Sequence, residues 1–111
     1  MPLYEHVCVT RQELSSNQVN NLMDRCGKIL TDNGGTVVGS EYWGSLRLAY
    51  KIKKNRKGHY FLLKIDSPSS AVQELERLMR INDSVIRFLT VRVEEHKDGP
   101  SPIDKVRRSR N

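Results

Sequence analysis

The chain has 111 residues, a net charge of +6 and a hydrophobic content of 37%. This length accommodates one domain with a modest core, which buries roughly two thirds of the surface that the unfolded chain exposes. No stretch approaches the ~20 apolar residues that a membrane-spanning helix needs. The N-terminal residues 1–6 lack the cationic region and apolar run of a secretory signal. These features argue against a membrane-spanning or exported protein.

The two cysteines, Cys8 and Cys26, have no CxxC partner and no histidine at zinc-finger spacing. Two isolated cysteines in a chain of this kind are typical of reduced thiols in the core of an intracellular protein. We therefore expect neither a zinc site nor a disulfide framework.

The start of the chain predicts a strand followed by a helix. Residues 3–10 are rich in β-branched and aromatic side chains, and neither face is clearly polar, which favours a central strand. Ser15 and Gln18 form a capping-box pattern that opens a helix over 16–33. The glycine pair at 34–35 ends this helix, because glycine adopts the left-handed conformation without a steric penalty.

The middle of the chain predicts a hairpin. Gly39 and the pair Trp43-Gly44 interrupt the second strand and predict a bulge or bend. Apolar side chains alternate along 46–52, which indicates a half-buried strand. We expect residues 53–58 to form a basic turn and residues 60–65 to form the next strand.

The remainder predicts a second helix over 69–82 and a fourth strand over 85–93. The composition then changes, because residues 96–111 are polar, basic and interrupted by glycine and proline. We expect a folded domain over 1–95 and a flexible basic tail over 96–111.

The element order β-α-β-β-α-β predicts an α+β, ferredoxin-like sandwich, with a four-stranded antiparallel sheet in the order 4-1-3-2 and two helices on one face. The alternation assigns one set of side chains to the helix-covered face: Tyr4, Cys8, Phe61, Leu63, Ile65, Ile86 and Phe88. It assigns a second set to the opposite face: Leu3, Val7, Val9, Tyr60, Leu62, Leu89, Val91 and Val93. This second face is apolar where a solvated face would alternate to polar residues, so it predicts a protein-binding surface. The alternative is that the tail covers it.

The positive charge is segregated along the chain. Residues 47–64, called here the basic hairpin, hold seven of the 19 Lys and Arg residues and no acid, whereas the chain outside this hairpin and the tail carries more acids than bases. Such segregation indicates a polyanionic ligand. The predicted phosphate contacts are Arg47, Lys51, Lys53, Lys54, Arg56 and Lys57, with Arg87 and Arg92 as additions from the fourth strand. The alternative is a solvated turn that is basic only for solubility.

Catalytic motifs are absent from the sequence, which has no Gly-rich phosphate loop, nucleophile elbow or HExxH pattern. We therefore predict no enzymatic activity, no cofactor and no metal. An RNA-recognition motif shares the predicted topology, but residues 57–64 match its third-strand pattern only weakly. His59 replaces the first stacking aromatic and Lys64 the last, which leaves Phe61 as the one aromatic in register.

Several separated motifs resemble the bacterial small-subunit ribosomal protein six family. They are Tyr4-Glu5, Tyr42-Trp43-Gly44, Leu48-Ala49-Tyr50-Lys51-Ile52, Lys57-Gly58-His59-Tyr60, Glu74-Leu75-Glu76-Arg77 and the run from Arg80 to Phe88. The resemblance covers residues 3–93 and implies the ferredoxin-like fold, together with binding to small-subunit ribosomal RNA jointly with ribosomal protein eighteen. His6 and Cys8 depart from it, since the family fills these places with larger apolar residues.

The sequence thus predicts a non-enzymatic component of the small ribosomal subunit, in the cytoplasm or in an organelle. The apolar face predicts a partner site of Leu62, Leu89, Val91 and Val93, and the resemblance names ribosomal protein eighteen as the partner. The alternatives are a free-standing single-stranded RNA-binding module of RRM-like topology or a small ferredoxin-like enzyme.

Overall fold

A computed structural model describes residues 1–96 of the chain. The expected tail over 96–111 lies outside the described residues, apart from His96. Within the described part, no helix is long and apolar enough to cross a membrane.

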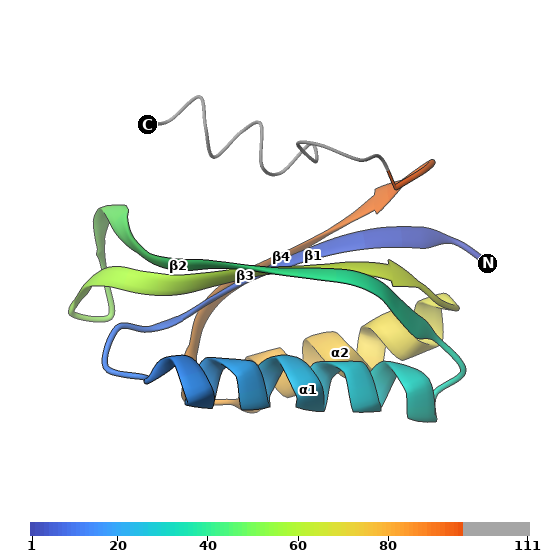
Figure 1. Cartoon of the computed structure of the whole chain (residues 1–111), viewed down its shortest axis with the longest axis horizontal. Coiled ribbons are helices and arrows are strands. Elements are labelled where there is room, and N and C mark those ends of the chain that lie inside the picture. The colour runs from blue at the N-terminus through green and yellow to red at the C-terminus, as the bar shows by residue number, and fades with distance from the viewer. Residues whose placement is uncertain (97–111) are drawn as a thin grey trace.

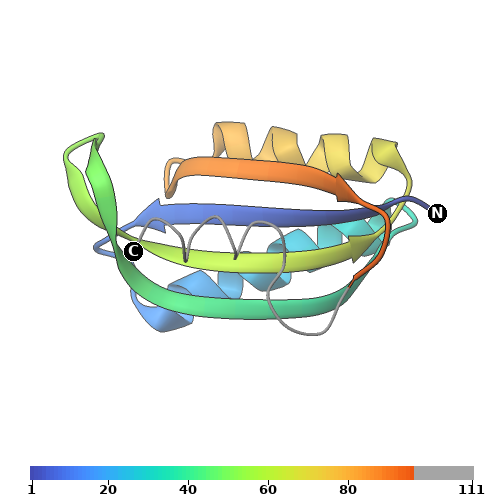
Figure 2. The same cartoon turned by 90° about the horizontal axis from the view of Figure 1, so that it is seen from above.

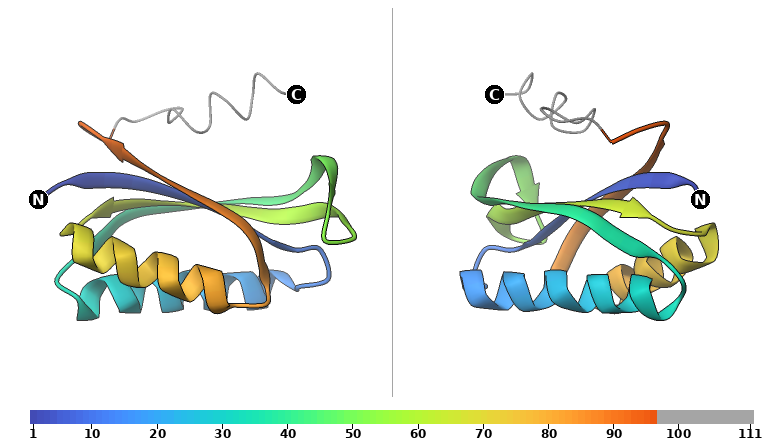
Figure 3. Two further views of the ribbon diagram at one scale, coloured as in Figure 1. Left: turned by 180° about the vertical axis from the view of Figure 1, so that it is seen from behind. Right: turned by 45° about the vertical axis from the view of Figure 1, so that its right-hand side comes forward.

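Four strands and two helices alternate in the predicted order. The elements are β1 (Leu3–Arg11), α1 (Ser16–Asp32), β2 (Thr36–Ile52), β3 (Asn55–Asp66), α2 (Ser69–Ile81) and β4 (Val85–Val93). The strands form one antiparallel sheet in the order β2-β3-β1-β4. Both helices lie on one face of this sheet (Figures 1 and 3). The predicted fold class and strand order are confirmed.

The residues at the two ends of α1 adopt the capping arrangements that the sequence predicts. The Gln18 backbone N–H donates to Ser15 Oγ at 3.1 Å, and the Ser15 N–H donates to Gln18 Oε1 at 2.8 Å. This reciprocal pair satisfies two donors that the first turn leaves without helical partners. At the other end, Gly34 has φ +87°, a conformation that L side chains rarely adopt.

The main core fills the space between the helices and the sheet. Its buried members include Cys8, Val19, Leu22, Cys26, Leu30, Phe61, Leu63, Ile65, Val72, Leu75 and Met79. Both cysteines are buried and free, as predicted. Burial raises the pKa of the Cys26 thiol to about 12 and raises that of Cys8 as well. Both thiols therefore stay protonated and act as small apolar groups in the core.

The hairpin turn is shorter than predicted. Ile52 pairs with Asn55, so β3 begins at Asn55 instead of Tyr60, and the turn consists of Lys53 and Lys54 alone. These two lysines have φ of 47° and 69°, the left-handed conformation that a tight two-residue hairpin turn requires. Neither is the glycine or asparagine that usually marks such a turn, so no local pattern predicts it.

Ile86 lies on the opposite side of the sheet from the one predicted. The pairing of β1 with β4 shifts between Val9 and Thr10, so Val9 pairs with Arg87 while Thr10 pairs with Val85. The extra residue reverses the alternation, and Ile86 packs with Val9 and Leu48 instead of joining Phe88 in the main core. The bulges predicted along β2 are present, with register shifts between Val37 and Gly39 and between Tyr42 and Gly44.

His6 occupies a fully buried position in β1, on the helix-covered face. Its Nδ1 lies 2.8 Å from Thr90 Oγ1, and its ring centroid lies 5.9 Å from that of Phe88. Burial lowers the pKa of the imidazole from its ordinary value of 6.5 to about 4. The folded state therefore keeps His6 neutral at pH values where the unfolded chain protonates it.

This difference predicts a pH-dependent loss of stability. Between pH 6.5 and pH 4 the unfolded state binds the additional proton, so the free energy of unfolding falls as the pH is lowered through this window. The contribution of His6 is at most about 3 kcal/mol, and it is absent above the window. Urea unfolding of the wild type and of His6→Gln across this range should give a shallower pH dependence for the variant. Parallel pH profiles for the two proteins would contradict the assignment.

Candidate RNA and partner interface

The outer part of β2 in the basic hairpin rises over the open face, defined here as the sheet face turned away from the helices. Between the pairs Arg47–Lys57 and Ile52–Asn55, residues 48–51 of β2 lie opposite Arg56 alone. This excess length lets β2 bend away from the helices, and the chain then turns back toward the sheet before it enters β3 (Figure 1).

Apolar packing secures the bend. Leu48, only 7% exposed, packs with Val9 and Ile86 in a second hydrophobic cluster. Ile52 and Tyr60 pack against the same cluster and are partly buried. These five residues, called here the open-face cluster, come from all four strands. The tip of the hairpin is therefore attached to the body of the sheet.

The turn end of the hairpin is also held by polar contacts to the segment that follows β1. Asn55 is buried, and its Oδ1 accepts from the Gln12 backbone N–H at 3.1 Å while its Nδ2 donates to the Lys53 carbonyl at 3.0 Å. The Lys57 N–H donates to Gln12 Oε1 at 3.2 Å. A Cβ at Gly58 would come within 2.6 Å of Val9 Cγ1, so only glycine lets β3 lie this close to β1.

Six of the predicted RNA-contacting residues are gathered on this hairpin. All six side chains are exposed: Arg47, Lys51, Lys53, Lys54, Arg56 and Lys57. None of them forms an ion pair within residues 1–96, where the recorded pairs join Arg11 to Glu13 and Arg77 to Glu74. Their charges are thus available to a ligand.

The two arginines predicted on β4 lie on opposite faces of the sheet, because alternate residues of a strand point to opposite sides. Arg87 pairs with Val9 of the open-face cluster, and its guanidinium carbon lies 5.9 Å from the centroid of the Tyr50 ring. Arg92 pairs with Tyr4, which packs against the main core. It also lies toward the end of β4 that is remote from the hairpin (Figure 2). The structure joins Arg87 to the basic hairpin and leaves Arg92 apart.

The predicted partner residues differ in exposure. Leu62 was expected on an exposed surface, but its side chain is fully buried. It lies on β3 with Val7 of β1 on one side and Glu41 of β2 on the other, whereas Leu89 lies on the edge strand β4 and is 54% exposed. Val91 and Val93 are half-buried.

Part of the open face is crossed by the chain itself. After β4 the backbone turns across β1 toward β3 (Figure 2), and the ring N–H of His96 at Nε2 donates to the Ile65 carbonyl at 3.0 Å. The described chain therefore reaches the open face at the end opposite the hairpin. The exposed apolar part that remains is centred on Leu89.

Sequence reasoning missed the aromatic contacts around the hairpin. The rings of Trp43 and Tyr60 stack with centroids 6.3 Å apart and an interplanar angle of 18°. Tyr50, which is 65% exposed, stacks on no other ring within residues 1–96 and contacts Arg87 instead. The clustering of aromatic residues with cations in 42–60 was visible in the sequence, but the bend that brings Tyr50 to β4 was not.

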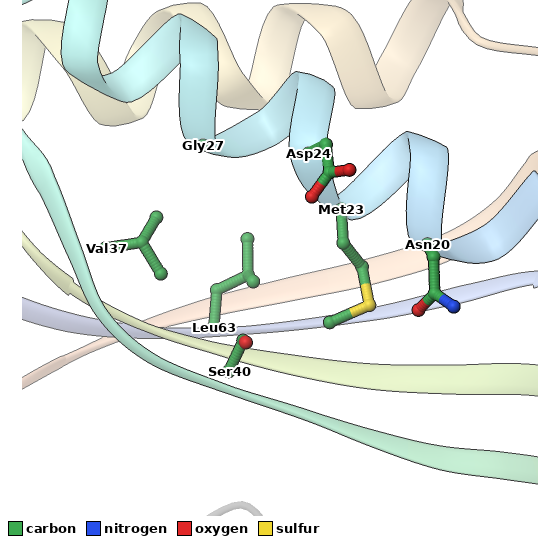
Figure 4. Close-up of a pocket in the computed structure, with 7 residues that line it drawn as sticks. All are labelled: Asn20, Met23, Asp24, Gly27, Val37, Ser40 and Leu63. Carbon is green, nitrogen blue, oxygen red and sulfur yellow. The ribbon is translucent and has the colours of Figure 1, made fainter. Parts of the chain in front are cut away.

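A shallow depression lies elsewhere, between α1 and β2 (Figure 4). Its lining consists of Asn20, Met23, Asp24, Gly27, Val37, Ser40 and Leu63. The lining includes no cation, and the carboxylate of Asp24 would repel phosphate. Within the described residues, no group of three His, Cys, Asp or Glu side chains is arranged to hold a metal ion.

The fold and the hairpin together define a class: a ferredoxin-like α+β protein whose hairpin carries six exposed cations that form no ion pair within residues 1–96. Residues 3–92 match the family described as Ribosomal protein S6. The chain therefore belongs to the ribosomal protein S6 family of the small ribosomal subunit, which confirms the resemblance noted in the sequence.

Curated relatives and a solved structure agree with this assignment. The chain is 60% identical to small ribosomal subunit protein bS6 of Ruegeria sp. over 91% of its length and 86% of the relative. It is 61% identical to that of Paracoccus denitrificans, covering 91% of the chain and 77% of the relative. The crystal structure of 30S ribosomal protein S6 from Thermotoga maritima aligns with a TM-score of 0.78 at 25% identity, over 98% of this chain and 94% of that one.

Proposed function

We propose that this protein is a non-enzymatic structural component of the small ribosomal subunit that binds small-subunit ribosomal RNA together with ribosomal protein eighteen. The observation that carries the proposal is the group of six exposed cations on the basic hairpin, none of them neutralised by an acid within residues 1–96. Its place of action would be the ribosome of the bacterial cytoplasm, as expected for a relative of the bacterial bS6 proteins.

Phosphate binding follows from the physical chemistry of these groups. Each Lys or Arg that neutralises a phosphate releases condensed counterions, so binding is strong at low salt and weakens steeply as salt rises. The open-face cluster and the contacts of Gln12 hold the hairpin in place, which lowers the entropy lost when RNA binds. Such contacts position the RNA and do not read its sequence.

The partner protein is proposed to contact the edge of the open face at β4. Leu89 is the most exposed large apolar side chain of this strand. Val91 and Val93, at alternate positions, continue the apolar row along the same face of β4. An apolar patch beside a cationic hairpin suits a second protein that binds the same RNA, because the protein-binding surface is then continuous with the RNA-binding surface.

The burial of Phe61 argues against the RRM-like alternative. This ring is fully buried in the main core between the sheet and the helices, so it is not available on the open face for a nucleobase. His59, at the other stacking position, is also buried, and its Nδ1 lies 2.6 Å from Tyr42 Oη. We therefore retain ribosomal assembly as the proposed role.

Replacing Lys53, Lys54, Arg56 and Lys57 by Ala should weaken binding to small-subunit ribosomal RNA and leave the fold intact. The plot of log affinity against log salt has a negative slope, and this slope should become shallower by up to about 3. The reason is that each lost phosphate contact reduces its magnitude by about 0.7 to 0.9. Filter binding across a salt series measures it. The matched control removes the same charge from the helices by replacing Arg25, Lys28, Arg77 and Arg80, and it should leave the slope unchanged. Equal slopes for the wild type and the hairpin variant would show that the hairpin does not contact phosphate and is basic only for solubility.

The double variant Leu89→Asp/Val91→Asp should fold and bind RNA weakly on its own, but it should lose partner-dependent assembly. Charged groups on this patch would be buried without partners in the interface. Gel-shift assays with RNA and ribosomal protein eighteen measure the effect. Val38→Asp/Ile81→Asp is the control, since these side chains are 54% and 64% exposed elsewhere on the surface. Normal assembly, or unfolding of the variant in circular dichroism, would refute the proposed partner site.

A further inference from the structure

Tyr50 is an exposed aromatic ring within a group of cations. Its side chain is 65% exposed, and the neighbouring Lys51 and Arg47 are exposed as well. The guanidinium carbon of Arg87 lies 5.9 Å from its ring centroid, a cation–π contact. Exposure of this extent leaves most of the ring surface accessible to a ligand.

The other aromatic rings of the hairpin region are already engaged. Trp43 stacks on Tyr60, and its indole N–H donates to Glu41 Oε1 at 3.0 Å. Tyr42 contacts the buried His59 through its hydroxyl. Among the aromatic side chains of residues 42–61, Tyr50 is the one whose ring has neither an aromatic neighbour nor a place in a core cluster.

The backbone that carries Tyr50 is fixed on both sides. Leu48 and Ile52, two residues before and two residues after it, pack into the open-face cluster. Arg87 is placed beside the ring by the pairing of β4 with Val9 of the same cluster. The backbone at Tyr50 is thus held in place by its neighbours, so less backbone entropy is lost when a flat ligand stacks on the ring.

From this arrangement we infer that Tyr50, backed by Arg87, is a stacking site for one unpaired nucleobase of the bound RNA. The inference rests on the proposed RNA binding and adds a contact to the base where the hairpin lysines contact phosphate. A base stacks on the exposed face of the ring, and Lys51 and Arg47 lie close enough in the chain to neutralise the phosphates beside it. Stacking of this kind is tolerant of base identity, because every base has a π-face. The hairpin cations around Tyr50 in the chain have no acid among them from residue 47 to residue 64, which favours an anionic ligand such as RNA over an uncharged protein surface.

The test compares two single strands of equal charge, decauridylate and an abasic ribose-phosphate decamer of the same length. Affinities of the full chain are measured for the wild type, Tyr50→Leu and the matched control Tyr50→Phe, which keeps the ring. The wild type and Tyr50→Phe should bind decauridylate at least about five-fold more tightly than the abasic decamer, the scale of stacking one base on an aromatic ring. Tyr50→Leu should bind both strands alike, at the level of the abasic decamer.

Several results would overturn the inference: equal affinity of the wild type for the two strands, a preference that survives in Tyr50→Leu, or no binding of either strand. Loss of assembly with ribosomal protein eighteen in Tyr50→Leu, with the base preference unchanged, would assign the ring to a protein contact instead. Failure here is separable from failure of the proposed function. The salt slope for the abasic decamer reports the phosphate contacts alone, and it should be steep in the wild type and in Tyr50→Leu whether or not a base stacks.

Discussion

The packing of Leu48 against Val9 and Ile86 is the interaction on which the rest of the interface depends. A basic hairpin without it would extend from the sheet as a flexible arm, and its cations would have no fixed relation to β4. Burial of one leucine side chain contributes about 1.5 to 3 kcal/mol, which offsets the backbone entropy of ordering about one or two residues. This small cluster brings Tyr50 to Arg87, at the end of the sheet opposite the crossing at His96.

Irregularities in the strands make that packing possible. The register shift in β1–β4 turns Ile86 to the open face, and the excess residues 48–51 let β2 bend onto it. Gly58 then allows β3 to approach Val9 more closely than any residue with a Cβ could. Bulges are typical of sheet regions that aim side chains at a ligand. In this protein they let the apolar side chains of the hairpin pack on the sheet while its cations remain exposed.

Most of the fold could be predicted from the sequence because its signals are local. The capping box at Ser15, the glycines after α1 and the period of each strand depend on neighbours in the chain, and the segregated charge needs only counting. Apart from the length of the hairpin turn, the predictions that were wrong concern relations between distant residues. The face of Ile86 depends on a shift in pairing with β1, and the burial of Leu62 depends on two flanking strands. The contact of Tyr50 with Arg87, which was not predicted, joins residues of β2 and β4. No local pattern encodes these.

We propose that the hairpin, held against the sheet by Leu48, attaches this protein to the small subunit. Co-sedimentation with small ribosomal subunits through a moderate-salt wash, comparing the wild type with Leu48→Ala, tests it most directly. The variant keeps every cation of the basic hairpin and loses the side chain that holds the tip. We expect the wild type to stay bound through the wash and folded Leu48→Ala, verified by circular dichroism, to be released at lower salt. Equal retention of the two proteins, or a wild type that is absent from the small-subunit fraction, would contradict the account.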